Sequence, residues 1–213
     1  QAAEKFGNGE VEFTTRLTVE IRGVHFDDIP AFQEFIAPAG LITGGTGSLV
    51  RPVVSCKGTT CQYGLYDTFA LSEKIHQRFY LGYHSVKLPH KFKIACGGCP
   101  NNCVKPALND LGIIGQLVPT VDSDACNGCK KCQIENTCPM QAAKLEDGEL
   151  TIDPALCSNC GLCVNRCPFD VVEGGVSGYK IYIGGRWGKK MAVAQPLNRL
   201  FTDEEELLRT VEK

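Results

Sequence analysis

The stretch CGGCPNNCVKP, residues 96–106, places three cysteines within eight residues. The chain has 213 residues, 13 of them cysteine, and its 43% hydrophobic and 22% charged content is that of an ordinary globular protein. Because reducing cytosol keeps thiols free, dense cysteine without a secretory signal indicates metal binding rather than disulfides. We therefore expect a cytoplasmic metalloprotein, in which the role of these three cysteines depends on how the others are used.

Charge and cysteine pattern change together in the middle of the chain. Residues 121–173 carry 4 basic and 9 acidic side chains, whereas residues 1–120 carry 11 and 10, and residues 174–213 carry 7 and 5. Eight cysteines also lie in this acidic stretch. We interpret it as an inserted domain. No apolar run approaches the roughly 20 residues of a membrane span, and no basic patch indicates nucleic-acid binding.

The insert contains two cysteine runs of ferredoxin type. CSNCGLCVNRCP, residues 157–168, matches the bacterial C-x2-C-x2-C-x3-C-P run, and CNGCKKCQIENTCP, residues 126–139, has five residues before its last cysteine instead of three. In such runs the cysteine before proline ligates the other cluster, so two complete crossing runs favour two [4Fe–4S] clusters over zinc or disulfides. The insert resembles a two-cluster ferredoxin. The expected ligands are Cys126, Cys129, Cys132 and Cys167 for cluster 1, and Cys138, Cys157, Cys160 and Cys163 for cluster 2.

Five cysteines remain, two in VRPVVSCKGTTCQYG, residues 50–64, and three in the opening stretch. Four thiolates from two separated pairs would hold a third [4Fe–4S] cluster and leave one thiol over. The spacing alone leaves a zinc site or plain buried thiols open as alternatives.

The residues around these cysteines resemble one protein family. GCPNNC, residues 98–103, is similar to the signature of the siroheme-dependent sulfite and nitrite reductases. Other motifs resemble that family in the same order, so the resemblance covers nearly the whole chain outside the insert. These motifs are FTTR (13–16), VRPVVSC (50–56), LPHKFK (88–93) and YKIYIGGRWG (179–188).

The resemblance implies an α+β fold, namely a siroheme/[4Fe–4S] reductase half-repeat with an inserted bacterial-type 2[4Fe–4S] ferredoxin domain. Mixed strands and helices in the sequence agree with that class. The implied domains are a partial N-terminal ferredoxin-like half-domain (1–50), a siroheme and [4Fe–4S] binding domain (51–120), the inserted ferredoxin domain (121–173) and the return of the siroheme domain (174–213).

The family pattern also implies roles for individual residues. It assigns the siroheme-coupled cluster to Cys56, Cys61, Cys99 and Cys103, with Cys103 also the axial ligand of the siroheme iron. Cys96 is then a spare, buried thiol. The basic residues that match those around the substrate anion are Arg16, Arg51, Lys91 and Lys93. Further candidates for binding the siroheme carboxylates are Arg22, Arg186, Lys189 and Lys190.

Two departures from the family pattern concern this site. Four residues separate Cys56 from Cys61 where several members have five, and Leu17 follows Arg16 where glutamine is frequent.

Local patterns predict where the cations lie. EVEFTTRLTVEI, residues 10–21, alternates as one strand with Arg16 on the polar face, and Lys91 and Lys93 share one face of a second strand. From pattern alone, a solvated strand face is the alternative. We expect helices over residues 27–40, over 65–82, directly after Cys103, and over 202–213 with a capping box at Thr202 and Glu205.

The activity implied by the resemblance is six-electron reduction of sulfite to sulfide, or of nitrite to ammonia. Sulfite is favoured because ferredoxin inserts accompany sulfite enzymes in this family. An electron-donor protein is expected to dock on the acidic insert, and a homodimer or a heterodimer with a related half would complete the site. The alternatives are an electron-transfer subunit without its own catalytic siroheme and a zinc-stabilised binding module.

Overall fold

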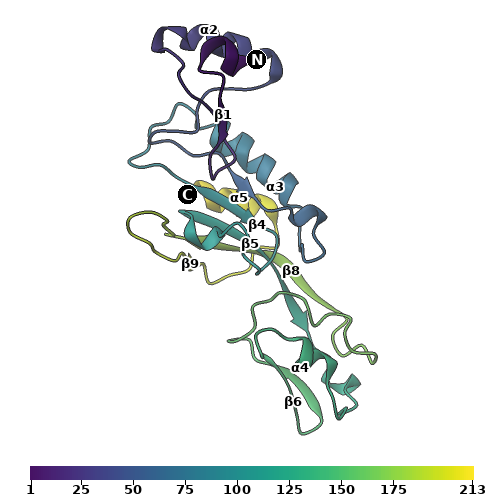
Figure 1. Ribbon diagram of the computed structural model, residues 1–213. Helices are drawn as coiled ribbons and strands as arrows, with labels where there is room; N and C mark the ends of the chain where they lie inside the picture. The colour runs from purple at the N-terminus through teal and green to yellow at the C-terminus, as the bar shows by residue number, and fades with distance from the viewer.

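The computed structural model describes residues 1–213, which form three regions in series (Figure 1). An N-terminal region, a sheet domain and a smaller lobe follow one another from the top to the bottom of that view. None of the helices combines the length and apolar character needed to cross a membrane.

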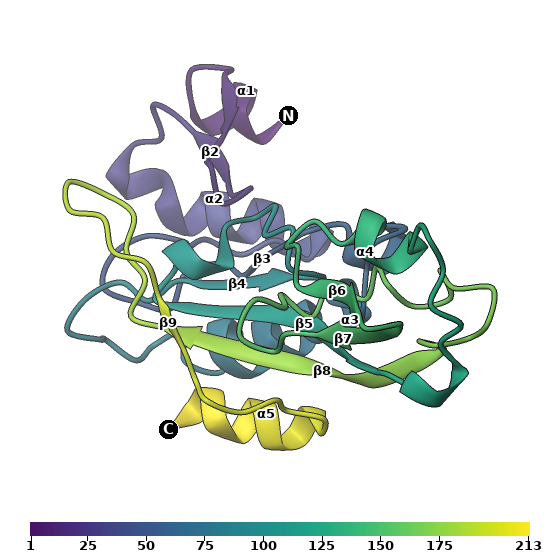
Figure 2. The same ribbon diagram turned by 90° about the horizontal axis from the view of Figure 1, so that it is seen from below.

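The sheet domain is built on five strands in the order β3-β4-β5-β8-β9. β4 lies parallel to β3 and β5, whereas β8 is antiparallel to both β5 and β9. Figure 2 shows β4, β5 and β8 running side by side. The strands are β3 (Val54–Ser55), β4 (Ile94–Gly97), β5 (Leu111–Thr120), β8 (Gly174–Ile183) and β9 (Gln195–Pro196). Strands and helices are therefore mixed, as the sequence predicted.

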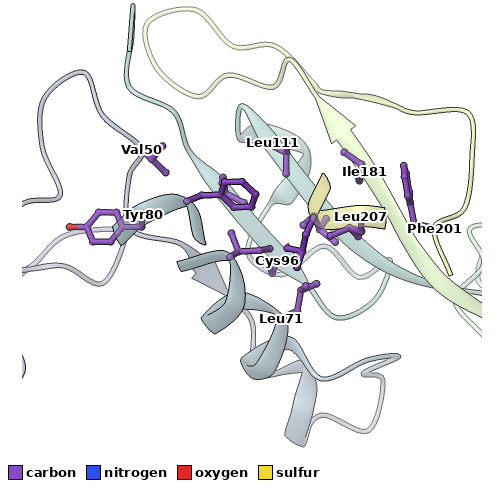
Figure 3. Close-up of a cluster of buried hydrophobic side chains, with 13 residues drawn as sticks. Val50, Leu71, Tyr80, Cys96, Leu111, Ile181, Phe201 and Leu207 are labelled. Atoms are coloured by element: carbon purple, nitrogen blue, oxygen red, sulfur yellow. The ribbon is translucent and has the colours of Figure 1, made fainter. Parts of the chain in front are cut away.

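Two helical segments cover the sheet and close its core. They are α3 (Thr68–Ile75), continued by a π-helical segment (His76–Leu81), and α5 (Glu204–Glu212). The helix expected over 65–82 is thus confirmed. The core contains 13 buried residues, in which Leu71 of α3 and Leu207 of α5 lie near Cys96 of β4 (Figure 3).

The lobe comprises residues 121–173 and extends from the ends of β5 and β8. These two strands pair over ten residues each, from Leu111 opposite Ile183 to Thr120 opposite Gly174. The lobe has its own small core of five buried residues. Its regular elements are a 3-10 turn (Ser123–Ala125), α4 (Gln133–Thr137) and the antiparallel pair β6 (Ala143–Glu146) and β7 (Glu149–Ile152).

The N-terminal region packs three aromatic rings together, Phe6 against Phe32 and Phe35. Its elements are α1 (Ala2–Phe6), β1 (Val11–Phe13), β2 (Val19–Ile21), a 3-10 turn (Phe26–Asp28) and α2 (Ile29–Ile36), which ends in a second 3-10 turn (Ala37–Ala39). The helix expected over 27–40 is confirmed, and Gly40 closes it in the left-handed conformation, with φ 70°.

Three local predictions were wrong. Residues 11–21 form a hairpin instead of one strand, because the chain turns at Thr14–Leu17 and Leu17 adopts φ 60°. The segment after Cys103 forms only a 3-10 turn (Pro106–Leu108), and a second such turn (Gly58–Thr60) lies between the first two cysteines. Helix α5 is capped by Asp203, whose carboxylate accepts from the Glu206 N–H at 2.7 Å, and not by Thr202.

Candidate functional site

The cysteines of the sheet domain approach one another at the end of β4 that leads into GCPNNC. Cys56 follows β3, and its Sγ accepts a hydrogen bond from the Gly98 N–H at 3.1 Å. The buried Thr68 hydroxyl donates to the Cys56 carbonyl at 2.8 Å, which ties the first cysteine segment to α3. A Cβ on Gly98 would lie 2.9 Å from the Gly58 Cα, so the two segments pack backbone to backbone. Glycine at both positions permits that approach.

The four thiols that the family pattern selects influence one another electrostatically. Burial raises the pKa of Cys99, and the nearby Cys103, Cys56 and Cys61 thiols raise it further. Cys103 is exposed, whereas the other three are partly buried. No three Cys, His, Asp or Glu side chains of the chain converge closely enough to hold a single metal ion. The ligands of a [4Fe–4S] cluster need not converge on one point, because each thiolate binds its own iron.

Cys96 is not one of those four thiols, and its side chain lies within the hydrophobic core. Its side chain is fully buried, and burial, with the nearby Cys56 thiol, raises its pKa to about 12 against the opposing effect of a hydrogen bond with Tyr66. A thiol in such surroundings stays protonated and inert. The prediction of a spare thiol agrees with this position.

In the lobe the eight cysteines divide into two groups. Cys126, Cys129, Cys132 and Cys167 line one pocket, together with Pro168. Burial raises the pKa of Cys163 to about 11, and Cys157, Cys160 and Cys138 contribute in the same direction. The proximity of the members within each group is compatible with the crossing ferredoxin pattern, and the assignment of these cysteines as cluster ligands stays a prediction.

Cys138 differs from its group in its backbone surroundings. Burial acts to raise its pKa, but backbone N–H groups that include those of Ala143, Ala142 and Met140 outweigh burial and lower it. Such hydrogen bonds favour the thiolate, the form in which cysteine binds metal.

A pocket of basic side chains lies at the other end of β4. Lys91 and Lys93 line it from the segment before β4, and Arg186 and Lys189 from the loop after β8. Asp110 also lines it and accepts the Lys93 backbone N–H at 2.8 Å. Lys91 and Lys93 thus face the same pocket, as the alternating pattern predicted.

Charges in and beside this pocket act on Lys93. Burial lowers the pKa of Lys93, the positive charges of Lys91, Arg16 and Arg51 lower it further, and Asp110 opposes them. A bound anion would relieve this repulsion among cations.

Arg16 reaches the sheet domain from the turn of the N-terminal hairpin. Its guanidinium donates to the Pro52 and Ile94 carbonyls, each at 2.7 Å, and to Asn109 Oδ1 at 2.8 Å. Burial and the charge of Arg51 lower its pKa to about 10, against the effect of Asp110. Arg16 therefore anchors the hairpin beside the basic pocket.

Arg51 completes this group of cations. Its Nη1 donates to the Gly45 carbonyl, while its Nε is buried without a hydrogen-bond partner. A buried, unpaired donor is costly in a folded protein and indicates that a partner belongs there.

Four of the eight predicted basic residues do not line the pocket. Arg16 and Arg51 lie beside it and act on Lys93 through their charges, whereas the other two have no such link to it. Arg22 pairs with Glu12 at 2.7 Å on the neighbouring strand of the hairpin, and Lys190 does not line the pocket. The sequence also gave no reason to select Asp110, His90 or Trp187, which do line it. The carboxylate of Asp110 could have been noticed, since it is the first acidic residue after GCPNNC.

Two protein-family models match the chain. One, described as the nitrite and sulphite reductase 4Fe-4S domain, covers residues 46–213. The other, the nitrite/sulfite reductase ferredoxin-like half domain, covers residues 1–39.

Known proteins agree with those matches. The coenzyme F420-dependent sulfite reductase of Methanocaldococcus jannaschii is 33% identical over 203 residues, which are 95% of this chain and 32% of that protein. One subunit of the anaerobic sulfite reductase of Salmonella typhimurium is 30% identical over 149 residues, 61% of this chain and 41% of that one. The chain thus spans about a third to two fifths of the length of these relatives.

A solved structure has the same fold. A crystal structure of dissimilatory sulfite reductase I matches with a TM-score of 0.72 at 23% identity, over 99% of this chain and 56% of that one. The resemblance noted in the cysteine and basic motifs is therefore confirmed, and the chain belongs to the nitrite and sulphite reductase family.

Proposed function

We propose that this chain provides the siroheme and cluster-binding part of a cytoplasmic sulfite reductase, with electrons entering through the lobe. The observation that carries this proposal is the pocket lined by Lys91, Lys93 and Arg186. It lies at one end of β4, and the GCPNNC cysteines lie at the other. An anion site and a cluster site on the same strand suit a reaction that delivers electrons to a small oxyanion.

The donor chemistry supports three [4Fe–4S] clusters. Each proposed group consists of four free thiols. In two of the groups, the other three thiols raise the pKa of one member, Cys99 in the sheet domain and Cys163 in the lobe. The proposed ligands are Cys56, Cys61, Cys99 and Cys103 beside the siroheme, and in the lobe Cys126, Cys129, Cys132 and Cys167 for cluster 1 and Cys138, Cys157, Cys160 and Cys163 for cluster 2.

Siroheme would be held by the thiolate of Cys103 and by basic side chains that pair with its carboxylates. Cys103 is the exposed member of its group, so its sulfur is accessible to such a ligand. Arg186 and Lys189 are suited to the carboxylates because they come from one loop at the pocket. Arg22 remains a prediction without this support, because its guanidinium already pairs with Glu12. When bound, siroheme supplies the iron and the electron reservoir for the reduction.

The protein's own side chains would bind the anion and supply protons. Lys91 and Lys93 attract the negative charge of sulfite, and Arg51 offers a buried Nε that has no partner in the protein. The lowered pKa of Lys93 makes its ammonium group a better proton donor than an ordinary lysine. Arg16 would contribute positive charge while its hydrogen bonds to the sheet domain keep it in place.

We also propose that the site is completed by a second chain, either another copy or a related half. Cys103 is exposed, and the hairpin leaves four apolar side chains at least 51% exposed, namely Val11, Phe13, Leu17 and Val19. Exposed apolar side chains gathered on one element indicate an interaction surface. The lobe, with 9 acidic and 4 basic residues, would receive electrons from a donor protein with a basic surface.

The first test is the ultraviolet–visible spectrum of the anaerobically purified protein, with and without sulfite. A Soret band and a red-region band that both shift on adding sulfite are expected. Iron–sulfur absorption alone, indifferent to sulfite, would contradict the proposal and favour an electron-transfer subunit. Steady-state rates with sulfite and with nitrite then decide between the two substrates.

A double variant tests the basic pocket. Lys91→Ala with Lys93→Ala should lower kcat/KM for sulfite by about 100-fold, because each lost group stabilises negative charge at the reacting anion. Lys87→Ala is the control, since Lys87 is exposed and does not line the pocket. An unchanged rate in the double variant, with siroheme still bound, would rule out this pocket as the substrate site.

A further inference from the structure

Strand β5 contacts both the sheet-domain cysteines and one loop of the lobe along the same edge. Its other edge is fully occupied by β8. On the first edge β4 pairs only as far as Gly97 opposite Ile114. Beyond that point the lobe takes the place of β4, because the Leu117 N–H donates to the Asn159 carbonyl at 2.8 Å and Leu117 forms a parallel bridge with Cys160.

The two cysteine loops therefore meet β5 close together. Ile114 and Leu117 are three residues apart, which is about 10 Å along a strand. Gly97 leads directly to Cys99, and Cys160 belongs to the group of Cys138, Cys157 and Cys163. The other lobe group lies farther out, because Gly128, between its first two cysteines, packs against Gly148 at the turn of β6 and β7, at the bottom of Figure 1.

Glycines make both contacts close. A Cβ on Gly115 would lie 2.5 Å from the Gly98 carbonyl oxygen, so the GCPNNC loop rests on β5 there. A Cβ on Gly161 would lie 2.8 Å from Leu117 Cδ2, so the lobe loop rests on β5 two residues later. Neither loop has room to move along the strand without losing this packing.

One side chain links the lobe to the strand. Asn159 Nδ2 donates to Gln116 Oε1 at 3.0 Å, and Gln116 is only 5% exposed. A buried acceptor such as Gln116 Oε1 needs a hydrogen-bond donor, and here Asn159 of the second cysteine run of the lobe provides it.

The first cysteine run shows what Asn159 adds. The residue before its second cysteine is Gly128, with φ 59°, and the corresponding residue in the second run is Asn159, with φ 56°. Glycine adopts this left-handed conformation at least cost, and asparagine is among the few other residues that tolerate it. The run next to β5 thus has a side chain where the outer run has none, and that side chain makes the hydrogen bond to Gln116.

We propose that Asn159 is a positioning residue that holds the Cys138, Cys157, Cys160 and Cys163 group against β5 and makes it the exit point of the lobe toward the sheet-domain cysteines. The proposal rests on the function proposed above. Electrons would pass singly from the outer group to this one and then to the sheet-domain group, each donor returning to its oxidised state as its neighbour is reduced.

The test compares three variants of the whole, cluster-loaded protein. Asn159→Gly keeps the backbone conformation and removes the hydrogen bond. Gln116→Met removes the acceptor at nearly constant volume, outside any cysteine run. Asn165→Gly is the matched control, because Asn165 also has a left-handed backbone, with φ 55°, but is exposed. The readouts are iron content, the magnetic coupling between reduced clusters by electron paramagnetic resonance, and the rate of sulfite reduction with dithionite-reduced methyl viologen.

Asn159→Gly and Gln116→Met, the two junction variants, should both keep their iron. They should lose the spin–spin broadening that arises between the cluster of the Cys138, Cys157, Cys160 and Cys163 group and the sheet-domain cluster. The rate should fall about tenfold, as is usual when a residue supporting a metal site is lost. The Asn165→Gly control should match the unchanged protein. If Asn159→Gly loses iron, its coupling cannot be interpreted, and the coupling measured in Gln116→Met then tests the inference. Full coupling in an iron-replete junction variant would overturn the inference, whereas failure of the proposed function appears earlier, as a missing siroheme spectrum in the unchanged protein.

Discussion

The sheet domain and the lobe are held together in different ways. The sheet domain closes around 13 buried residues, with helices on a five-stranded sheet. The lobe has 53 residues, eight of them cysteine, and only five buried residues in its core. A core this small contributes little to stability, and small domains with such cores often rely on metals or disulfides. The comparison teaches that apolar packing can stabilise the sheet domain by itself, whereas we infer that the lobe depends on the clusters proposed to bind its eight cysteines.

The largest expected effect comes from removing iron. An iron chelator applied to the anaerobic protein should abolish hydrogen-exchange protection throughout residues 121–173, because metal binding there supplies the free energy of folding. Protection in β4 and in residues 111–116 of β5 should persist, since the apolar core of the sheet domain remains intact. Exchange of both regions is followed by mass spectrometry.

The comparison would break if the two regions lost protection together, or if the lobe stayed protected without iron. Joint loss of protection would mean that the two regions unfold as one unit. Protection of the lobe without iron would mean that its five-residue core suffices for its stability.

The next largest effect is expected in the apolar core of the sheet domain. Ile113 is fully buried in the centre of β5, so Ile113→Ala should lower the free energy of unfolding of the sheet domain by about 3 kcal/mol through lost packing and a cavity. Val118→Ala, on the same strand but 37% exposed, should change it by less than about 0.5 kcal/mol. Denaturant unfolding followed by Trp187 fluorescence measures both.

The matched change in the lobe is Leu150→Ala. Leu150 is 1% exposed in the lobe core, yet in the cluster-loaded protein its loss should leave the denaturant midpoint of the sheet domain unchanged. An equal shift from Leu150→Ala and Ile113→Ala would contradict separate stabilisation of the two regions.

A smaller effect is expected at the start of α5, where the sequence pattern predicted Thr202 as the N-cap residue and the structure has Asp203. Asp203→Ala should destabilise the sheet domain by about 1 kcal/mol, because it removes the acceptor of the Glu206 N–H. Thr202→Ala should be close to neutral. The opposite ranking in thermal unfolding would restore the capping box at Thr202.

The features of the fold and of the site that could be predicted from the sequence were those determined by residues close together in the chain. The spacing of the lobe cysteines was enough to predict which of them lie near one another, because ferredoxin-type runs have characteristic spacings. Their role as cluster ligands stays a prediction. Lys91 and Lys93 were predicted to share a face because side chains alternate along extended chain. The resemblance predicted the family, which the comparisons confirm. Its assignment of four sheet-domain thiols to a cluster stays a prediction.

The remaining features arise from tertiary contacts. The turn at Arg16 was missed because Thr14, Thr15 and Leu17 form no usual turn sequence, and the hydrogen bonds of Arg16 to Pro52 and Ile94 lie far away in the chain. The same holds for the ten-residue pairing of β5 with β8, whose partners are separated by the whole lobe. A single sequence contains no sign of such long-range pairs.

The smallest expected effect concerns the second contrast between the regions, the acidic lobe and the basic pocket. Asp110 raises the pKa of Lys93 against burial and the neighbouring cations. Asp110→Asn keeps an acceptor for the Lys93 N–H but removes that charge, so the pKa of Lys93 falls further. Lys93 then loses its proton at lower pH, so the alkaline rise in KM for sulfite should begin at lower pH. At a fixed alkaline pH, KM of the variant should be about threefold higher than that of the unchanged protein. Asp147→Asn is the control, because Asp147 is an exposed lobe carboxylate at φ 51°, which asparagine tolerates. A shift to higher pH, or an equal shift from Asp147→Asn, would mean that the overall charge of the protein, and not the pocket, governs binding of the anion.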